Sequence, residues 1–215
     1  MRVLVACEYS GIVRDAFTRL GHDATSVDFL PSETEGKHIQ GDVLDVIKSQ
    51  SFDIMIAHPP CTDLAVSGAR WFPEKRADGR QQRALEFVRA LLDAPIDRIA
   101  LENPVSVISS YIRKPDQIVQ PWQFGHEATK TTCLWLKGLP PLMATNIVGR
   151  GERHITKSGR SLPKWYNVPP SPDRWKYRSR TYEGIAQSMA EQWGVENNAY
   201  QLMFRERGAS DERLA

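Results

Sequence analysis

The sequence predicts an α/β protein built on a mostly parallel, doubly wound sheet. Short apolar runs rich in β-branched residues alternate with segments of helical periodicity from residue 2 to about residue 138. Such alternation is typical of parallel strands joined by helices that cover both faces of the sheet. Polar side chains follow most of the expected strands, and ligands of these sheets bind at the carboxyl ends of the strands. That edge of the sheet is therefore the expected position of a functional site.

Six apolar runs account for the expected strands. Each is short and contains residues that favour extended backbone, although the third run has the weakest pattern. The runs are residues 2–7, 24–29, 38–43, 52–58, 98–103 and 131–138. Polar residues end or follow the first five of them: Glu8, Asp28, Asp42, the Pro-Pro-Cys segment at 59–61, and Glu102 with Asn103.

Three segments show the apolar spacing of a helix with one buried face. They are residues 10–21, 80–93 and 181–193. Ser10 is the expected N-cap of the first helix and Gly21 its C-cap. Thr181 is the expected N-cap of the last helix.

Composition excludes several classes of protein. The 215 residues fit one domain, or one domain with a small appendage, and a net charge of +2 creates no general field that would select a partner. Three widely spaced cysteines argue against a disulfide framework and for a reducing compartment. The histidines show no zinc-finger spacing with these cysteines, so no metal site is expected. No run approaches the ~20 apolar residues of a membrane span, and no signal peptide is visible. A cytoplasmic protein with no membrane partner is expected.

The turn after the first strand, "CEYSG" at residues 7–11, is where a nucleotide could approach a helix N-terminus. It contains one glycine, Gly11, so a dehydrogenase with a Gly-x-Gly-x-x-Gly pattern is disfavoured. Asp28 ends the second strand, where an acid can accept hydrogen bonds from ribose hydroxyls, and Asp42 could bind an adenine amino group. The alternative is that both are ordinary loop acids.

The segment from His58 to Cys61, "HPPC", ends the fourth strand with a stiff turn. Proline fixes its own φ and restricts the residue before it, so Cys61 should be held at the carboxyl edge of the sheet. It is either a buried structural thiol or a mounted nucleophile. Glu102, in "ALENP", should reach the same edge, where it is either a catalytic proton donor or a cap for the segment that starts at Pro104.

Together these motifs resemble the DNA (cytosine-5) methyltransferases, in particular short, phage-type members. That family carries a Pro-Pro-Cys nucleophile, a mobile loop with Ser and Gly, and a Glu-Asn pair on the next strand. Here "HPPCTDLAVSG" is followed by "ALENP", and "LWLKGLPPL" and "GIAQSMAEQWG" are also shared. The resemblance covers residues 1–138 and 178–194. It implies a Rossmann-like, S-adenosylmethionine-dependent methyltransferase fold with a small, irregular, basic insert.

The resemblance also implies a covalent mechanism. The Cys61 thiolate adds to carbon 6 of a cytosine that has left the helix stack, and Glu102 contacts ring nitrogen 3 and the exocyclic amine. Carbon 5 then takes the methyl group of S-adenosylmethionine. Asn103 would position either Pro60 and Cys61 or the base, and Lys130 would contact the base oxygen or a phosphate.

The implied cofactor residues lie at the ends of the first four strands. They are Cys7, Glu8, Tyr9, Ser10, Gly11, Asp28, Phe29, Asp42, Val43, His58 and Pro59. Three features depart from the family pattern: Tyr9 stands where a glycine is expected, "ENP" replaces "ENV", and Lys130 and Thr132 stand where the family has two arginines. These departures leave open a related acceptor or a modified methyl donor.

Residues 139–178 form the expected insert, in which basic and aromatic residues are interleaved with little apolar periodicity. Such a segment suits phosphate contacts and base stacking, and the alternative is a solvated surface loop. The expected division of the chain is a catalytic domain at 1–138, a target-recognition-like insert at 139–178, a returning helix at 179–195 and a C-terminal tail at 196–215.

The expected nucleic-acid contacts come from the insert, from the segment before the last strand and from the loop after Cys61. They are Ser67, Arg70, Lys130, Thr132, Arg150, Arg153, Lys157, Arg160, Lys164, Trp165, Arg174, Lys176 and Arg178. The loop at 62–72 would act as a lid, with Arg70 reaching a phosphate. A small insert reads few base edges, so short or relaxed sequence specificity is expected.

The combined expectation is a monomeric enzyme that methylates double-stranded DNA in the cytoplasm of a bacterial host. Phage or prophage origin, with evasion of restriction as the purpose, fits this expectation. Two alternatives remain open. One is the same chemistry on RNA or a free nucleotide, and the other is a non-catalytic DNA-binding protein on a methyltransferase scaffold.

Overall fold

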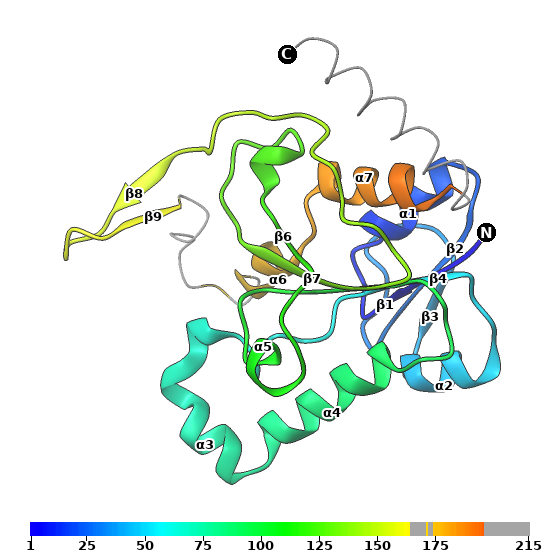
Figure 1. Cartoon of the computed structure of the whole chain (residues 1–215), viewed down its shortest axis with the longest axis horizontal. Coiled ribbons are helices and arrows are strands. Elements are labelled where there is room, and N and C mark those ends of the chain that lie inside the picture. Colours follow the sequence, from blue (N-terminus) through cyan, green and yellow to red (C-terminus); the bar gives the residue numbers. More distant parts are fainter. Residues whose placement is uncertain (164–170, 172–173, 196–215) are drawn as a thin grey trace.

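The structure of the protein, a computed structural model, describes residues 1–163, 171 and 174–195 (Figure 1). Its centre is a seven-stranded sheet with the order β3-β2-β1-β4-β5-β7-β6. Only β7 is antiparallel to its two neighbours, β5 and β6. The strands of this sheet are β1 (Arg2–Ala6), β2 (Asp23–Asp28), β3 (His38–Gln40), β4 (Ile54–Ala57), β5 (Ile99–Asn103), β6 (Gln117–Val119) and β7 (Thr132–Lys137).

Helices cover both faces of the sheet (Figure 1). One face carries α1 (Ile12–Arg19) and α7 (Glu183–Trp193), and the other carries α2 (Val43–Ser49) and α4 (Arg80–Leu92). Alternate residues of β1 divide between two core layers, because successive side chains of a strand point to opposite faces. Val3 and Val5 pack with α1 and α7, whereas Leu4 and Ala6 pack with α2 and α4. No helix in the described ranges is long and apolar enough to cross a membrane.

Shorter elements surround the carboxyl edge of the sheet. They are the 3₁₀ helices η1 (Val66–Trp71) and η2 (Pro121–Gln123), the helices α3 (Phe72–Ala77), α5 (Ile108–Tyr111) and α6 (Arg174–Ser179), and the hairpin of β8 (Arg153–Ile155) and β9 (Ser161–Pro163). In Figure 1 the hairpin and α3 both project to the left of the sheet. The predicted tail and the residues 164–170 and 172–173 of the insert lie outside the described residues, and the predicted division of the chain stays a prediction.

The predicted mostly parallel sheet with helices on both faces is confirmed. All six expected strands are present, with ends that differ by a few residues. The third strand ends at Gln40, because the Asp42 carboxylate caps α2 by accepting a hydrogen bond from a backbone amide. The N-caps predicted at Ser10 and Thr181 are wrong, because α1 and α7 each begin one residue later than expected. The short elements α2, α3, α5 and β6 were not expected, since segments of this length carry little periodic signal.

Glu8 takes the capping role that was expected of Ser10. Its carboxylate accepts hydrogen bonds from the backbone amides of Val13 (2.7 Å) and Arg14 (3.1 Å) at the start of α1. A negative charge at this end of a helix is favoured by the helix dipole. Glu8 therefore fixes α1 to the end of β1.

The side chain of Arg14 is buried and holds the loop between β2 and β3. Its guanidinium group contacts Asp15 (2.8 Å), Ser26 (3.2 Å), Ser32 (3.0 Å), Thr34 (2.5 Å) and the carbonyl of Glu35 (2.9 Å). Gly11 lies beneath this loop with φ of +75°, and a Cβ added there would lie 2.1 Å from Thr34 Oγ1. The single glycine of the predicted cofactor turn is thus required by the packing of the loop.

Replacing Arg14 with methionine should lower the free energy of unfolding by about 3 kcal/mol, because removing one member of a buried ion-paired cluster leaves the others unpaired. Arg19→Met, at the exposed end of the same helix, should change it by less than about 0.5 kcal/mol. Urea unfolding followed by circular dichroism measures both values. Similar losses in the two variants would contradict the role given to Arg14.

Candidate functional site

A cavity of about 130 Å³ lies where β1, β4 and β5 end. Five separate parts of the chain supply its walls: the ends of these three strands with the turns that follow them, the residue Lys130, and the segment at the end of α6. The lining residues are Cys7, Glu8, Tyr9, Ser10, His58, Pro59, Pro60, Cys61, Glu102, Asn103, Pro104, Lys130, Ser179, Arg180 and Thr181. All five residues predicted to be catalytic therefore lie around one cavity, together with several of those predicted to bind a cofactor.

Cys61 follows β4 on a segment that is held at both ends. Its carbonyl oxygen accepts hydrogen bonds from the amides of Leu64 (3.1 Å) and Ala65 (2.8 Å), so the chain turns directly after the thiol. The carbonyl of Pro59 accepts a hydrogen bond of 2.9 Å from Nδ2 of Asn103, which is buried at the end of β5. Two prolines, a turn and a bond between strand ends thus restrict the position of Cys61.

Glu102 lies on β5 beside His58. Its Oε2 is 3.3 Å from Nδ1 of His58, and the two side chains are 17% and 11% exposed. The backbone amide of His58 donates to the carbonyl of Ala6 (2.9 Å), which fixes the start of the imidazole side chain. His58 was predicted to contact a cofactor, and the structure shows one of its ring nitrogens bonded to Glu102.

The thiol of Cys61 lies among charged groups of both signs. Burial raises the pKa of Cys61, and the carboxylate of Glu102 raises it further, whereas a backbone hydrogen bond, Lys130 and Arg178 lower it. Burial lowers the pKa of Lys130, while Glu102 and Cys61 raise it. Cys61 is therefore a neutral thiol at rest, and its ionisation depends on the balance between Glu102 and the two cations.

The turn after β1 brings two acids close to a strained residue. Cys7 has a φ of 58°, which is uncommon for a residue with a side chain. Burial, and then the negative charges of Asp28 and Asp42, raise the pKa of the Cys7 thiol to about 12. Each of these carboxylates also accepts a backbone amide hydrogen bond, from Leu30 (2.9 Å) and Leu44 (2.8 Å) respectively.

The other predicted cofactor residues lie outside the cavity wall. Phe29, next to Asp28, is 72% exposed, although a side chain of this size is usually buried. Val43 is buried in the core on α2, and Gly11 packs under Thr34. The edge formed by β1, β2 and β3 therefore presents the exposed ring of Phe29 and the carboxylates of Asp28 and Asp42. Val43 and Gly11 contribute to packing instead.

Residues 174–182, called the strap below, contain α6 and pack against the turn after β1. The ring of Tyr9 is 5.6 Å from that of Trp175, at an interplanar angle of 53°. The hydroxyl group of Tyr9 is 3.3 Å from Oγ of Ser179. The tyrosine that replaces the expected glycine is thus a contact point for the strap.

Two further bonds hold the strap near the cavity. The guanidinium group of Arg180 donates to Oε2 of Glu33 at 2.5 Å, and Nζ of Lys130 donates to the carbonyl of Arg180 at 3.0 Å. Sequence reasoning missed Arg180 and its neighbours as part of the cavity. The pairing of Glu33 with Arg180 joins distant parts of the chain, so local patterns do not predict it. The one local signal for a contact with the strap was Tyr9, which stands where a glycine was expected.

The predicted lid after Cys61 contains the helix η1, and its base is anchored. Lys75 is buried, lies 3.2 Å from Asp63, and donates a hydrogen bond to the carbonyl of Thr62. Ser67 and Arg70 are exposed on η1, as expected for residues that meet a large ligand. These contacts fix the start of the segment to α3, and the predicted closing of the lid stays a prediction.

The structure separates the remaining predicted DNA contacts. Thr132 is buried on β7, and Arg150 lies over the ring of Trp122 at 5.2 Å. The other basic residues form two groups, one on the β8–β9 hairpin and one on α6: Arg153, Lys157 and Arg160, and Arg174, Lys176 and Arg178. Lys164 and Trp165 lie outside the described residues.

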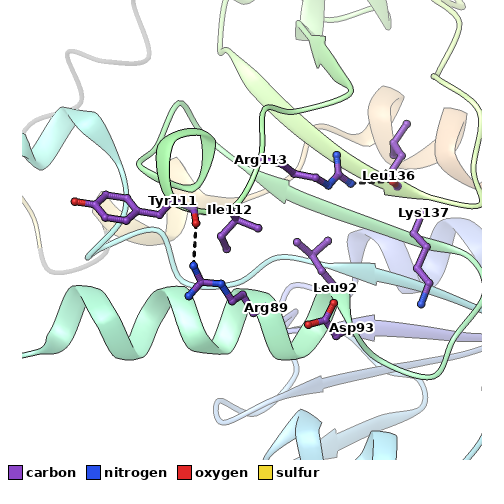
Figure 2. A pocket seen from close by; sticks show the side chains of 8 residues that line it. All are labelled: Arg89, Leu92, Asp93, Tyr111, Ile112, Arg113, Leu136 and Lys137. Atoms are coloured by element: carbon purple, nitrogen blue, oxygen red, sulfur yellow. Dashed lines mark hydrogen bonds between the residues drawn. The ribbon is translucent and has the colours of Figure 1, made fainter.

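A larger cavity, of about 710 Å³, lies between α4, α5 and β7 (Figure 2). Its walls include none of the predicted site residues. Arg89 donates to the carbonyl of Tyr111 (2.8 Å), and Arg113 donates to the carbonyl of Leu136 (2.9 Å). These bonds join α4 to α5, and the segment after α5 to β7, so a structural role accounts for both guanidinium groups.

The alkylation rate of Cys61 should respond in opposite directions to two neutralising changes. Glu102→Gln removes a negative charge, lowers the pKa of the thiol and should speed alkylation at pH 7.5, whereas Lys130→Met raises the pKa and should slow it. Changes of about two- to tenfold correspond to shifts of about 0.3–1 pKa unit. Peptide mass spectrometry after timed iodoacetamide treatment separates Cys61 from Cys7 and Cys133. A change of the same sign in both variants would exclude the charge balance described above.

No family model matches the chain, and no curated protein matches it. Among solved structures it is similar to a protein encoded within an E. coli prophage and assigned as a DNA modification methyltransferase. That similarity has a TM-score of 0.47 and 17% identity, over 70% of this chain and 53% of that chain. It is also similar to the Entamoeba histolytica methyltransferase EhMeth, with a TM-score of 0.46 and 16% identity, over 71% of this chain and 58% of that chain. This chain thus spans little more than half of the length of each of the two solved proteins.

Proposed function

We propose that the protein is an S-adenosylmethionine-dependent methyltransferase that acts on carbon 5 of cytosine in DNA. The observation that carries this proposal is the meeting of Cys61, Glu102 and Lys130 at one cavity. A thiol beside a carboxyl group and a cation has the components needed for nucleophilic attack on an electron-poor ring. The sequence resemblance supports cytosine as that ring.

Each of these residues has a defined task in the proposed reaction. Sγ of Cys61 forms a bond to carbon 6 of the cytosine after the thiol loses its proton, and the cation of Lys130 stabilises the thiolate. Glu102 orients the ring through ring nitrogen 3 and the exocyclic amine. Asn103 keeps Pro59, and with it Cys61, in place. Carbon 5 then takes the methyl group of S-adenosylmethionine. Transfer of the carbon-5 proton to solvent restores the C5–C6 double bond as the bond between Sγ and carbon 6 breaks, and Cys61 leaves as a thiolate.

The open sheet edge beside the cavity fits the methyl donor. Phe29 offers an exposed aromatic face for an adenine ring, and Asp28 and Asp42 offer acceptors for hydroxyl and amino groups. The turn at residues 7–10 lines the cavity that holds Cys61. When bound, S-adenosylmethionine supplies an electrophilic methyl group.

The strap has to shift before a base can enter. Ligand sites usually measure about 300–1,000 Å³, whereas the cavity beside Cys61 measures about 130 Å³. Ser179, Arg180 and Thr181 of the strap form one of its walls. The ion pair of Arg180 with Glu33 is partly exposed, and such pairs contribute about 0–1 kcal/mol. This pair therefore adds little to the cost of opening the strap, which must also break the contacts with Tyr9 and Lys130.

Basic residues on α6 and on the β8–β9 hairpin supply contacts to DNA phosphates in this proposal. In Figure 1 the hairpin projects to the left of the sheet, and α6 lies nearer the middle of the molecule. Phosphate contacts carry little sequence information, and a hairpin of two three-residue strands reads few base edges. Short or relaxed sequence specificity remains part of the proposal.

Expression in a host without cytosine methylation should place 5-methylcytosine in the host DNA, which bisulfite sequencing would map. Cys61→Ala should abolish the signal, because the other thiol that lines the cavity, Cys7, has a pKa raised to about 12 and does not supply a thiolate, whereas Cys133→Ala should retain it. Duplex DNA that contains 5-fluorocytosine should form a covalent complex with the wild type and with Cys133→Ala, but not with Cys61→Ala. Absence of methylcytosine in wild-type cells would refute the DNA activity and direct the assay to RNA and nucleotides. Methylation by Cys61→Ala would refute the nucleophile.

Binding to duplex DNA should weaken as salt rises, because neutralised phosphates release counterions. Changing both Lys157 and Arg160 of the hairpin to glutamine should make the slope of log K against log salt shallower by about two. Lys48→Gln on α2, which lies away from the hairpin in Figure 1, serves as the control and should leave the slope unchanged. Fluorescence anisotropy at four salt concentrations gives the slopes. Equal slopes in the hairpin variant and the wild type would remove the hairpin from the DNA interface.

A further inference from the structure

A buried nitrogen atom beside Glu102 has no hydrogen-bond partner. Nδ1 of His58 lies 3.3 Å from Oε2 of Glu102, but Nε2 of the same ring is buried and unpaired within the part of the chain that the structure describes. Buried polar atoms are nearly always paired. The unpaired atom therefore limits the protonation states that the imidazole can take.

The two neutral forms of His58 differ in what they leave unpaired. A proton on Nε2 would bury an N–H group without an acceptor, and such a group loses its hydration without gaining a hydrogen bond. A proton on Nδ1 instead donates to Glu102 and leaves only a lone pair on Nε2, and unpaired acceptors are tolerated better than unpaired donors. A doubly protonated ring meets the same penalty at Nε2. The geometry thus selects a neutral ring with its proton on Nδ1.

The partner of that proton must then be an acceptor. If Glu102 were protonated on Oε2, it would donate to Nδ1 and drive the imidazole proton to the unpaired Nε2. The Nδ1–H form therefore goes with a Glu102 whose Oε2 carries no proton and accepts the imidazole N–H. Oε1 is left as the carboxyl oxygen that can meet a ligand.

We propose that His58 is a positioning residue that fixes the carboxyl group of Glu102, with Oε2 bound to Nδ1–H and Oε1 left to meet the substrate. This inference rests on the proposed function for its consequence, which is that Glu102 contacts the base through Oε1 alone. His58 acts through Glu102 and needs no contact with the base.

The surrounding backbone supports a positioning role. His58 donates its backbone amide to Ala6 on β1, and the next residue, Pro59, accepts a hydrogen bond from Asn103. Consecutive residues of β5, Glu102 and Asn103, are therefore bonded to consecutive residues after β4. One bond orients the proposed acid, and the other orients the segment that carries Cys61.

Nuclear magnetic resonance of the ring nitrogens tests the tautomer directly. In wild-type protein labelled with ¹⁵N-histidine at pH 7.5, the His58 signals, assigned by their loss in His58→Asn, should show the proton on Nδ1. Glu102→Ala should move the population toward the Nε2–H form. Protonation of Nε2 in the wild type, or an unchanged tautomer in Glu102→Ala, would overturn the proposal. This measurement needs no methyl transfer, so its result stands even if the proposed function fails.

Two substitutions of His58 test the consequence for catalysis. His58→Asn places an amide N–H near the position of Nδ1–H and should keep kcat for DNA methylation within about threefold, whereas His58→Leu should lower kcat about 100-fold, as misplacement of a catalytic group does. KM for DNA should change little in either variant. Thermal unfolding confirms that both are folded. Equal losses in the two variants would overturn the positioning role, and an inactive wild type would overturn the proposed function alone.

Discussion

The hydrogen-bond register between β4 and β5 is the constraint on which the candidate site depends. Ala57 pairs with Leu101 in parallel strands, so the residues that follow β4 and those that end β5 reach the same edge of the sheet. A slip of one residue would turn Glu102 to the opposite face and bring Asn103 beside the wrong partner. The buried residues Ile56 and Leu101 fill different core layers, and this packing makes the register specific.

Buried polar side chains hold the loops in fixed positions relative to the paired strands. Glu8 fixes α1, Arg14 fixes the loop before β3, Asn103 fixes the Pro-Pro turn and Lys75 fixes the segment after Cys61. Glu8, Arg14 and Lys75 each have at least two such partners, which offset the desolvation that burial of a polar group costs. These loops need such bonds because they bury little apolar surface of their own. The residues that surround the cavity are consequently positioned by groups that hold backbone rather than ligand.

The sequence was sufficient to predict the sheet and the edge at which the site lies. Strands and their polar ends follow from local patterns, so Cys61 and Glu102 could be placed together without coordinates. The residue that caps α1 was harder to predict. Glu8 reaches the helix across a turn, and the residue types at positions 10 and 11 do not indicate this contact. Gly11 was read as room for a ligand, whereas the structure shows it making room for Thr34.

The strap and the pairing of His58 could not be predicted, and for a common physical reason. Each depends on a contact between segments that are far apart in the chain, such as Glu33 with Arg180 or His58 with Glu102. A single sequence carries no record of which polar residues pair across such distances. Lys130 was identified through the family resemblance, but its bond to the strap carbonyl emerges only in three dimensions.

The hydrogen bond from Lys130 to the carbonyl of Arg180 connects access to the cavity with the ionisation of Cys61. With the strap in place, Lys130 donates to the carbonyl of Arg180, and Arg178 of the strap also lowers the pKa of the thiol. In the proposed reaction the strap moves to admit the base, which withdraws Arg178 and releases the ammonium group of Lys130 from the carbonyl. Lys130 is then the cation that remains beside Cys61 to stabilise a thiolate against the charge of Glu102. When the strap opens, stabilisation of the Cys61 thiolate therefore depends on Lys130, which precedes β7 and does not belong to the strap.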